Sequence, residues 1–181
     1  MIDYIVLGVV QNEALTGYDI KKWIESGIGN FYKASYGNLY PALKRLTDKE
    51  LVTMDEQPQG GRKKKYYKAT ELGKETFMEW LALPFDFSLG APTLLAKIYF
   101  FGQLPEKIRN QQLQEYETHY RQNLRKLKTI EKKLSESEVD TDYFMQSTLY
   151  LGIRNIQTAI EWFGHIKEQR TFSEFVNVDN E

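Results

Sequence analysis

Apolar residues recur at helical spacing along most of the chain, and this pattern predicts a mainly α-helical protein. Leu39, Leu43 and Leu46 fall at i, i+4 and i+7, so they share one face of a helix and can be buried together. The same reasoning predicts the helices 2–11, 17–26, 38–46, 71–83, 93–102 and 106–137. A last helix carries a 4-3-4-3 stripe typical of a coiled-coil seam, formed by Leu149, Ile153, Ile156, Ile160 and Phe163.

Three hydroxyl residues stand where helices are expected to begin. Thr16, Ser35 and Thr70 each precede a helical pattern, and such side chains accept hydrogen bonds from the free N–H groups of a first turn. Pro41 is awkward in the helix after Ser35, because proline cannot donate a backbone hydrogen bond. We therefore expect an irregular first turn, with regular helix only from residue 38 or 39.

One short region departs from the helical pattern. Residues 51–54 and 65–69 have a strand-like composition and flank a turn at 58–61 that holds proline and two glycines. They predict a β-hairpin. The expected fold class is thus mainly α with a small hairpin: a winged helix-turn-helix followed by a helical dimerisation domain with two long antiparallel helices.

The domain organisation follows from the turn-forming residues. Residues 84–92 contain two prolines and a glycine, and they form the best boundary in the sequence. We expect a winged helix-turn-helix domain at 1–83, a linker at 84–92, a helical dimerisation domain at 93–175, and a flexible tail at 176–181. Because two helices with one apolar stripe each leave apolar surface uncovered, the seam predicts a homodimer.

Composition adds limits to this picture. The chain has 181 residues, no cysteine and a net charge of −1, and it contains no apolar run of the length that spans a membrane. These features fit a cytoplasmic protein without disulfides. Residues 1–70 hold 11 Lys and Arg against 8 Asp and Glu, while the rest of the chain is acidic, so only the first part favours a polyanionic partner.

The helix after Ser35 carries side chains suited to a DNA groove. Asn pairs with adenine and Arg with guanine, whereas Tyr and Lys mostly hold phosphates. The start of the helix can also hold a phosphate. The alternative is that the tyrosines pack against the hairpin and the cations are ordinary surface. The candidate reading residues are Ser35, Tyr36, Asn38, Tyr40, Lys44 and Arg45.

The predicted hairpin carries a cluster of positive charges at its tip. Four consecutive cations follow two glycines, and on a hairpin after a helix-turn-helix they indicate a wing that grips the DNA backbone. A solvated charge run is the alternative. The candidate wing residues are Gly61, Arg62, Lys63, Lys64 and Lys65. Tyr4, Lys21 and Lys22 are weaker candidates for phosphate contact.

Several of these motifs, taken in order, resemble the PadR-like transcriptional regulators. The resemblance runs from residue 4 to residue 81 and is carried by Thr16-Gly17-Tyr18-Asp19-Ile20, by the run from Ser35 to Leu46, by Gly61-Arg62 with the lysines after it, and by Trp80-Leu81. It implies a dimeric bacterial repressor, bound to double-stranded operator DNA and released by a small effector. The domain at 1–83 would then be the DNA-binding domain, and the domain at 93–175 the dimerisation and effector domain. The wing is richer in lysine than the Gly-Arg-Pro-Arg pattern of the family, which favours phosphate grip over base reading.

Other functions have weaker support. Aromatic Tyr150 and Trp162 are candidates for an effector pocket, although plain dimer packing explains them as well. Glu115 and His119 lie at i, i+4, but two ligands are too few to predict a metal site. No nucleophile or phosphate-loop motif predicts an enzyme, and no cofactor is expected. A protein-interaction module and a constitutive DNA binder without an effector stay open as alternatives.

Overall fold

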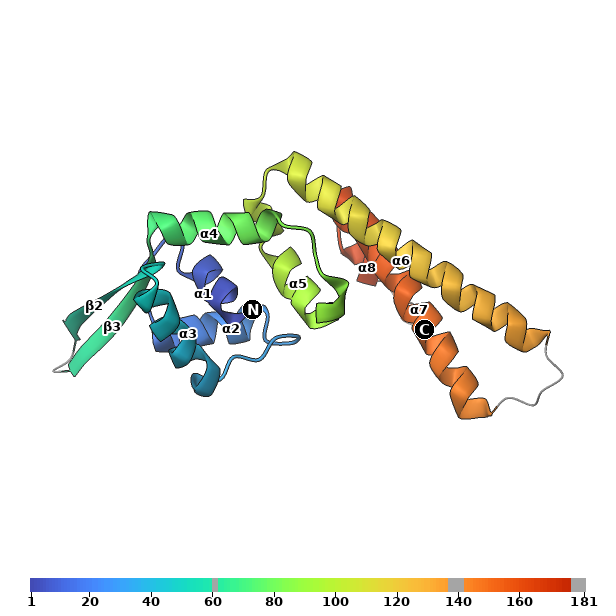
Figure 1. Cartoon of the computed structure of the whole chain (residues 1–181), viewed down its shortest axis with the longest axis horizontal. Helices are drawn as coiled ribbons and strands as arrows, with labels where there is room; N and C mark the ends of the chain where they lie inside the picture. Colours follow the sequence, from blue (N-terminus) through green and yellow to red (C-terminus); the bar gives the residue numbers. More distant parts are fainter. Residues whose placement is uncertain (60–61, 137–141, 177–181) are drawn as a thin grey trace. The chain divides into compact units, whose positions relative to one another are not determined.

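The computed structural model describes residues 1–59, 62–136 and 142–176, and the chain divides into two compact units at 1–105 and 106–181. Helices dominate both units, and one small antiparallel sheet of three strands lies in the first (Figure 1). The predicted fold class, mainly α with a hairpin, is confirmed.

Three helices form the core of the first unit. α1 (Ile2–Val9), α2 (Gly17–Gly27) and α3 (Tyr36–Asp48) contact one another. Each turns its apolar stripe inward, as the spacing of those residues predicts. The inward side chains include Ile5, Val6, Ile20, Ile24, Leu39, Leu43 and Leu46.

All three predicted N-caps are present. The hydroxyl of Thr16 accepts from the Asp19 N–H at 3.2 Å, and that of Thr70 accepts from the Gly73 N–H at 3.0 Å at the start of α4 (Glu71–Ala82). Ser35 caps α3 through the Asn38 N–H. α3 is a continuous helix from its first residue, Tyr36, so the prediction of an irregular first turn around Pro41 is wrong.

The hairpin is longer than its composition predicts. β2 (Val52–Gln59) pairs with β3 (Arg62–Ala69) in a ladder that runs from Val52 opposite Ala69 to Gln59 opposite Arg62. A third strand, β1 (Leu15–Thr16), pairs with the other edge of β3. The sequence pattern predicts only a break between two helices at these residues. Two residues are too few to show a period, and only pairing with a distant segment makes them a strand.

An aromatic cluster holds α5 (Ala91–Tyr99) and the short 3-10 helix η2 (Phe101–Gln103) on the first unit. Phe100 meets Phe77 of α4 edge to face at 5.4 Å and stacks on Trp23 of α2 at 6.0 Å between ring centroids. Gly8 of α1 makes this possible, because a Cβ there would lie 2.7 Å from the Phe100 ring. The division into compact units therefore falls after residue 105, thirteen residues beyond the end of the linker expected at 84–92.

Residues 84–92 instead connect two helices of the same unit. They include the 3-10 helix η1 (Phe87–Leu89), and the Phe85 ring meets that of Phe87 at 5.3 Å. Of the tail expected at 176–181, only residue 176 is described, and residues 177–181 lie outside the described part of the chain.

The second unit is a pair of long helices with a short third one. α6 (Glu106–Ser135) and α7 (Tyr143–Lys167) lie side by side, and α8 (Ser173–Val176) follows (Figure 1). Phe163 of α7 packs on Tyr116 and Tyr120 of α6, with ring centroids 6.2 and 5.2 Å apart.

This packing corrects the reading of the predicted dimer seam. Ile153, Ile160 and Phe163 are buried, whereas Leu149 and Ile156 are half-buried. Gly152, inside the same stretch, lies against Leu127 of α6. Within the chain, α6 therefore covers Ile153, Ile160 and Phe163. The assignment of Leu149 and Ile156 to a dimer contact stays a prediction.

Among the described residues, none of the helices has the length and apolar character needed to cross a membrane.

Candidate nucleic-acid interface

Two tyrosines form the outward face of α3. Tyr36 and Tyr40 are 45% and 48% exposed and stack with ring centroids 5.8 Å apart. The ammonium of Lys21, from α2, lies 5.0 Å from the centre of the Tyr36 ring. A hydrogen bond to Glu25 raises the pKa of Lys21, so the charge persists at neutral pH. Two hydroxyls and a cation thus share one exposed surface, held by a helix whose other face is buried.

Asn38, a candidate for base reading, forms its hydrogen bonds within the protein. Its Oδ1 accepts from the backbone N–H of Ser35 at 2.9 Å, while its own N–H donates to the Ser35 hydroxyl at 3.3 Å. The pair forms a reciprocal capping box. The side-chain amide is 3.5 Å from the Lys33 carbonyl, a marginal contact. Adenine recognition by Asn38 would require opening this cap, so the structure favours a structural role.

Arg45 is also engaged within the protein. Its guanidinium contacts both carboxylate oxygens of Asp3 in α1, with Nε 3.2 Å from Oδ2 and a terminal nitrogen 2.5 Å from Oδ1. A bidentate pair of this kind fixes the guanidinium plane. Lys44, one position earlier, is exposed. Arg45 would have to leave Asp3 to read guanine, whereas Lys44 is accessible as it stands.

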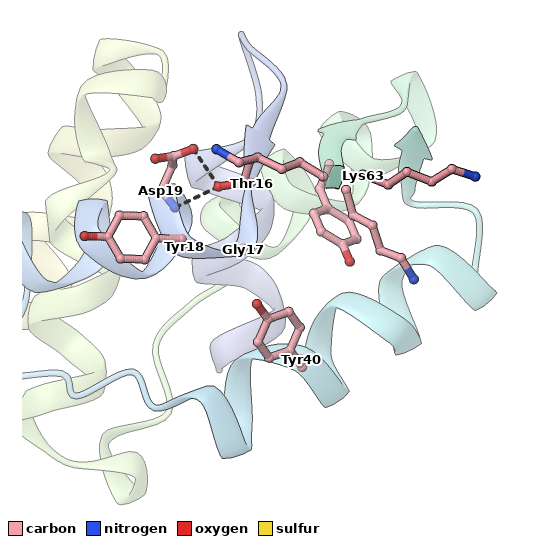
Figure 2. A pocket seen from close by; sticks show the side chains of 9 residues that line it. Thr16, Gly17, Tyr18, Asp19, Tyr40 and Lys63 are labelled. Atoms are coloured by element: carbon pink, nitrogen blue, oxygen red, sulfur yellow. Dashed lines mark hydrogen bonds between the residues drawn. The ribbon is translucent and has the colours of Figure 1, made fainter. Parts of the chain in front are cut away.

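A groove of about 460 Å³ separates the hairpin from the start of α2. Figure 2 shows Tyr40 on α3 facing the groove and Thr16 and Asp19 bonded to each other where α2 begins. A Cβ on Gly17 would lie 3.2 Å from the Tyr40 hydroxyl, so the two surfaces are close. The groove is lined by Thr16, Gly17, Tyr18, Asp19, Tyr40, Lys63, Lys64, Lys65 and Tyr67.

The positive charges of the three wing lysines on β3 are only weakly neutralised by acidic neighbours. Glu56, on the neighbouring strand, lies 3.8 Å from Lys63 and 3.9 Å from Lys65, and all these side chains are exposed. Ion pairs this long in solvent contribute little, so the lysines stay free to meet phosphates. Gly61 lies outside the described residues, and Arg62 is described only as the first residue of β3. Asp19 opposes the positive charge of the groove from the far side.

Two other tyrosines lie near this surface. Tyr4, a candidate for phosphate contact, stacks on Trp80 with centroids 4.7 Å apart and belongs to the α1–α4 packing. Tyr18, which sequence reasoning did not name as a DNA contact, is 62% exposed beside the groove. Lys22 is exposed on α2.

The aromatic pair suggested as an effector pocket does not come together in one chain. Tyr150 and Trp162 stand twelve positions apart on the continuous helix α7, about 18 Å along its axis at 1.5 Å per residue. Tyr150 is exposed beside Leu149 and Leu134, and the Trp162 ring is 5.3 Å from that of Phe163. Two such distant rings cannot line one small pocket of a single chain.

Two family models match the chain. Residues 6–79 match the Transcriptional regulator PadR-like family, and residues 93–169 match the family described as Virulence activator alpha C-term. The first region holds α3, the wing, and the groove between the wing and the start of α2.

One curated protein and two solved structures are similar to the chain. The negative transcriptional regulator PadR of Bacillus subtilis is 35% identical over 82 residues, which cover 45% of this chain and 45% of that protein, so the match spans about half of the relative's length. A solved structure of B. subtilis PadR with operator DNA is 26% identical, with a TM-score of 0.46 over 92% of this chain and 97% of that one. A second, with p-coumaric acid, is 24% identical, with a TM-score of 0.42 over 93% and 97%.

Proposed function

We propose that this chain, which belongs to the PadR-like family of transcriptional regulators, binds duplex DNA through α3 and the β2–β3 wing. The observation that carries the proposal is the exposed face shared by Tyr36, Tyr40 and Lys21, with the wing lysines across the groove. In this arrangement α3 enters the major groove. Tyrosine hydroxyls and lysine ammoniums hold the backbone phosphates on either side.

The capped start of α3 supports the same orientation. The N-terminus of a helix carries a partial positive charge, and here the capping box between Ser35 and Asn38 keeps the first turn ordered. Lys44 lies on the same helix, exposed, and is the cation best placed for a groove contact. Arg45, paired with Asp3, is assigned to orienting α3 on α1.

We extend the proposal to a repressor that acts as a dimer and is released by a small effector. Repression rests on the relationship to the B. subtilis negative regulator. A dimer would set two copies of α3 about one duplex turn apart, in successive major grooves. An effector could weaken DNA binding only by binding better to a dimer in which that spacing differs.

The exposed face at the start of α7 supports the dimer. It holds four large apolar side chains, all more than half exposed, which share one side of the helix at 3.6 residues per turn, and monomeric proteins rarely expose large contiguous apolar surface. A second copy of the chain is the partner we propose for it. The four are Tyr143, Phe144, Tyr150 and Leu151.

The DNA-binding proposal is tested by the salt dependence of binding to labelled duplex DNA from the region upstream of the chain's own gene. A variant with Lys63, Lys64 and Lys65 changed to alanine is compared with wild type. The logarithm of the binding constant falls linearly with the logarithm of the salt concentration. Removal of one lysine–phosphate interaction makes this slope shallower by about 0.9. We expect weaker binding and a shallower slope for this variant.

The matched control changes three exposed lysines of α6, Lys126, Lys132 and Lys133, to alanine. It removes the same charge from the other unit and should leave the slope unchanged. Equal slopes for wild type and the wing variant would contradict the assignment of the wing.

A protein-interaction module is the second candidate, since winged helices also bind proteins. The wing distinguishes the two functions. A neutral protein surface would offer no negative charges to its weakly paired lysines, whereas DNA phosphates would. A constitutive DNA binder differs from the main proposal only in lacking an effector. A thermal-shift screen with small aromatic compounds separates those two.

A further inference from the structure

Gly17, the first residue of α2, lies against one of the two exposed tyrosines of α3. Gly17 is buried, and a Cβ built on it would have the side chain of Tyr40 as its nearest neighbour. That Cβ would lie 3.1 Å from Cε1, 3.2 Å from the hydroxyl oxygen and 3.3 Å from Cζ of Tyr40. Real Cβ atoms seldom have contacts this short. Any side chain at position 17 would therefore push the hydroxyl end of Tyr40 aside.

The backbone itself does not require glycine at position 17. Among the described glycines only Gly90 has a positive φ, so Gly17 has a conformation that alanine also adopts. Glycine loses more backbone entropy on folding than alanine does, which makes it the less favourable residue within a helix. What the protein gains from Gly17 is the space that Tyr40 fills.

Tyr36 holds the same ring from within α3. One turn earlier on this helix, it stacks on Tyr40 with ring centroids 5.8 Å apart and the planes inclined by 23°. The Lys21 ammonium lies 5.0 Å from the centre of the Tyr36 ring and pairs with Glu25 of its own helix. The contact between α2 and α3 thus gives the Tyr40 side chain a fixed direction, although Tyr40 is 48% exposed.

The fixed hydroxyl belongs to the groove that the wing lysines line. Tyr40 and all three wing lysines border this groove, and Figure 2 shows the Tyr40 hydroxyl directed from α3 toward Gly17. The one carboxylate in the lining is that of Asp19, which accepts a hydrogen bond from the Thr16 hydroxyl at 2.6 Å. Three positive charges against one negative charge favour a phosphate in the groove, and a tyrosine hydroxyl can donate to it.

We propose that Gly17 is a positioning residue for DNA binding. It leaves the space in which Tyr40 lies, and Tyr40 donates its hydroxyl hydrogen to a backbone phosphate that the wing lysines attract into the groove. This inference rests on the proposed function. It adds to that function a residue that acts through its neighbour, and it assigns one hydrogen bond to one hydroxyl.

Fluorescence anisotropy with labelled duplex DNA from the region upstream of the chain's own gene tests the proposal. Wild type is compared with Gly17→Ala, with Tyr40→Phe and with the variant that carries both changes. Loss of one hydrogen bond to a charged group weakens binding by about tenfold. We expect about this loss for each single variant, and no greater loss for the double variant, because both changes remove the same contact.

Three results of this comparison overturn the proposal while DNA binding by wild type stands. Gly17→Ala or Tyr40→Phe binds DNA as tightly as wild type does. Alternatively, the two losses multiply to about a hundredfold in the double variant, so that Gly17 acts independently of the Tyr40 hydroxyl. A wild type that binds no duplex DNA contradicts the proposed function, and this inference with it.

Thermal unfolding separates positioning from damage to the fold. Because alanine reduces the entropy of the unfolded chain, and the half-exposed Tyr40 can swing aside, Gly17→Ala should melt at the same temperature as wild type or higher. Weaker DNA binding joined to a lower melting temperature would assign the loss to the fold and overturn the proposal. Gly102→Ala is the matched control, since a Cβ on Gly102 of η2 meets nothing within 4 Å. It should bind DNA like wild type.

Nuclear magnetic resonance of the full chain with ¹³C-labelled tyrosine follows the ring without DNA. The ring signals of Tyr40 are identified by their loss in Tyr40→Phe. They should shift in Gly17→Ala and stay in place in Gly102→Ala. Unshifted Tyr40 signals in Gly17→Ala would show that position 17 does not set the direction of this side chain, and the proposal would fall.

Discussion

Lysines in this protein have opposite environments, and the environment decides what each can do. Lys63 is exposed on the wing, where its charge is hydrated and free to approach a polyanion. Lys97 is enclosed by aromatic and apolar side chains, and its ammonium donates to a backbone carbonyl. In the sequence both are simply lysines. The difference between them comes from what surrounds each side chain.

The burial of Lys97 predicts an unusual dependence of stability on pH. Between about pH 8 and pH 10 the folded protein loses the proton of Lys97 while the unfolded chain keeps it. Since the unfolded state binds more protons there, the free energy of unfolding should rise with pH across this window, by at most about 2–3 kcal/mol. Urea unfolding at a series of pH values measures the slope.

Lys97→Met is the control for this slope and should flatten it. The tyrosines with raised pKa, such as Tyr32 and Tyr67, act in the opposite direction from about pH 9 upward, where the unfolded chain begins to ionise its tyrosines. A wild-type protein that loses stability steadily from about pH 8 to about pH 9 would contradict the assignment.

At the scale of elements, α3 shows how a helix tolerates a proline near its start. Pro41 leaves the carbonyl of Gly37 without its usual partner four residues later. Gly37 is exposed, so water can take that place, and it has no side chain to crowd the proline ring. The capping box at Ser35 and Asn38 stabilises the turn before it. The helix therefore begins at Tyr36 and presents Tyr36 and Tyr40 on one face.

The cap predicts a measurable loss of stability. Ser35→Ala removes the acceptor for the first turn and should lower the free energy of unfolding by about 1 kcal/mol. Asn38→Ala removes the reciprocal bond and should cost a similar amount. Thermal unfolding followed by circular dichroism measures both changes. Ser26→Ala alters an exposed serine that caps no helix start and should stay within about 0.5 kcal/mol of wild type. A neutral Asn38→Ala would return Asn38 to the candidates for base reading.

At the scale of the whole molecule, each long helix of the second unit covers apolar surface of the other and pairs with some of its charges. Glu117 of α6 illustrates this, because it contacts Lys167 of α7 at 2.9 Å and Arg121 of its own helix at 2.6 Å. The hydrogen bond from Lys167 is the main reason that the pKa of Glu117 is lowered. What the pairing leaves uncovered is the start of α7, and there we place the contact with a second copy.

This surface predicts the effect of a charge on assembly. Leu151→Glu places a carboxylate in the exposed apolar face of α7 and should convert a dimer to a monomer, because an unpaired charge cannot be buried cheaply. Light scattering coupled to size-exclusion chromatography measures the mass. Thr158→Glu, on an exposed position further along α7, is the control and should remain a dimer. A wild type that is monomeric at all accessible concentrations would remove the dimer from the proposed function.

The sequence by itself determined the main helices, the presence of a hairpin, and the inward faces of the first helices. Leu39, Leu43 and Leu46 are buried as their spacing predicts, and the hydroxyls of Thr16, Ser35 and Thr70 cap the helices they precede. These features depend on neighbours within one or two turns, so a linear pattern contains them. The lysine-rich wing was visible for the same reason.

Only the tertiary structure decided what each side chain meets across the fold. It joined β1 to β3, paired Asn38 and Arg45 with partners within the protein, and covered part of the α7 seam with α6. It also enclosed Lys97 beneath residues 83–86. Such contacts join residues from separate elements, and they compete with the roles that the same residues could play at a surface. A periodic pattern records that a face is buried, and packing alone decides which surface covers it.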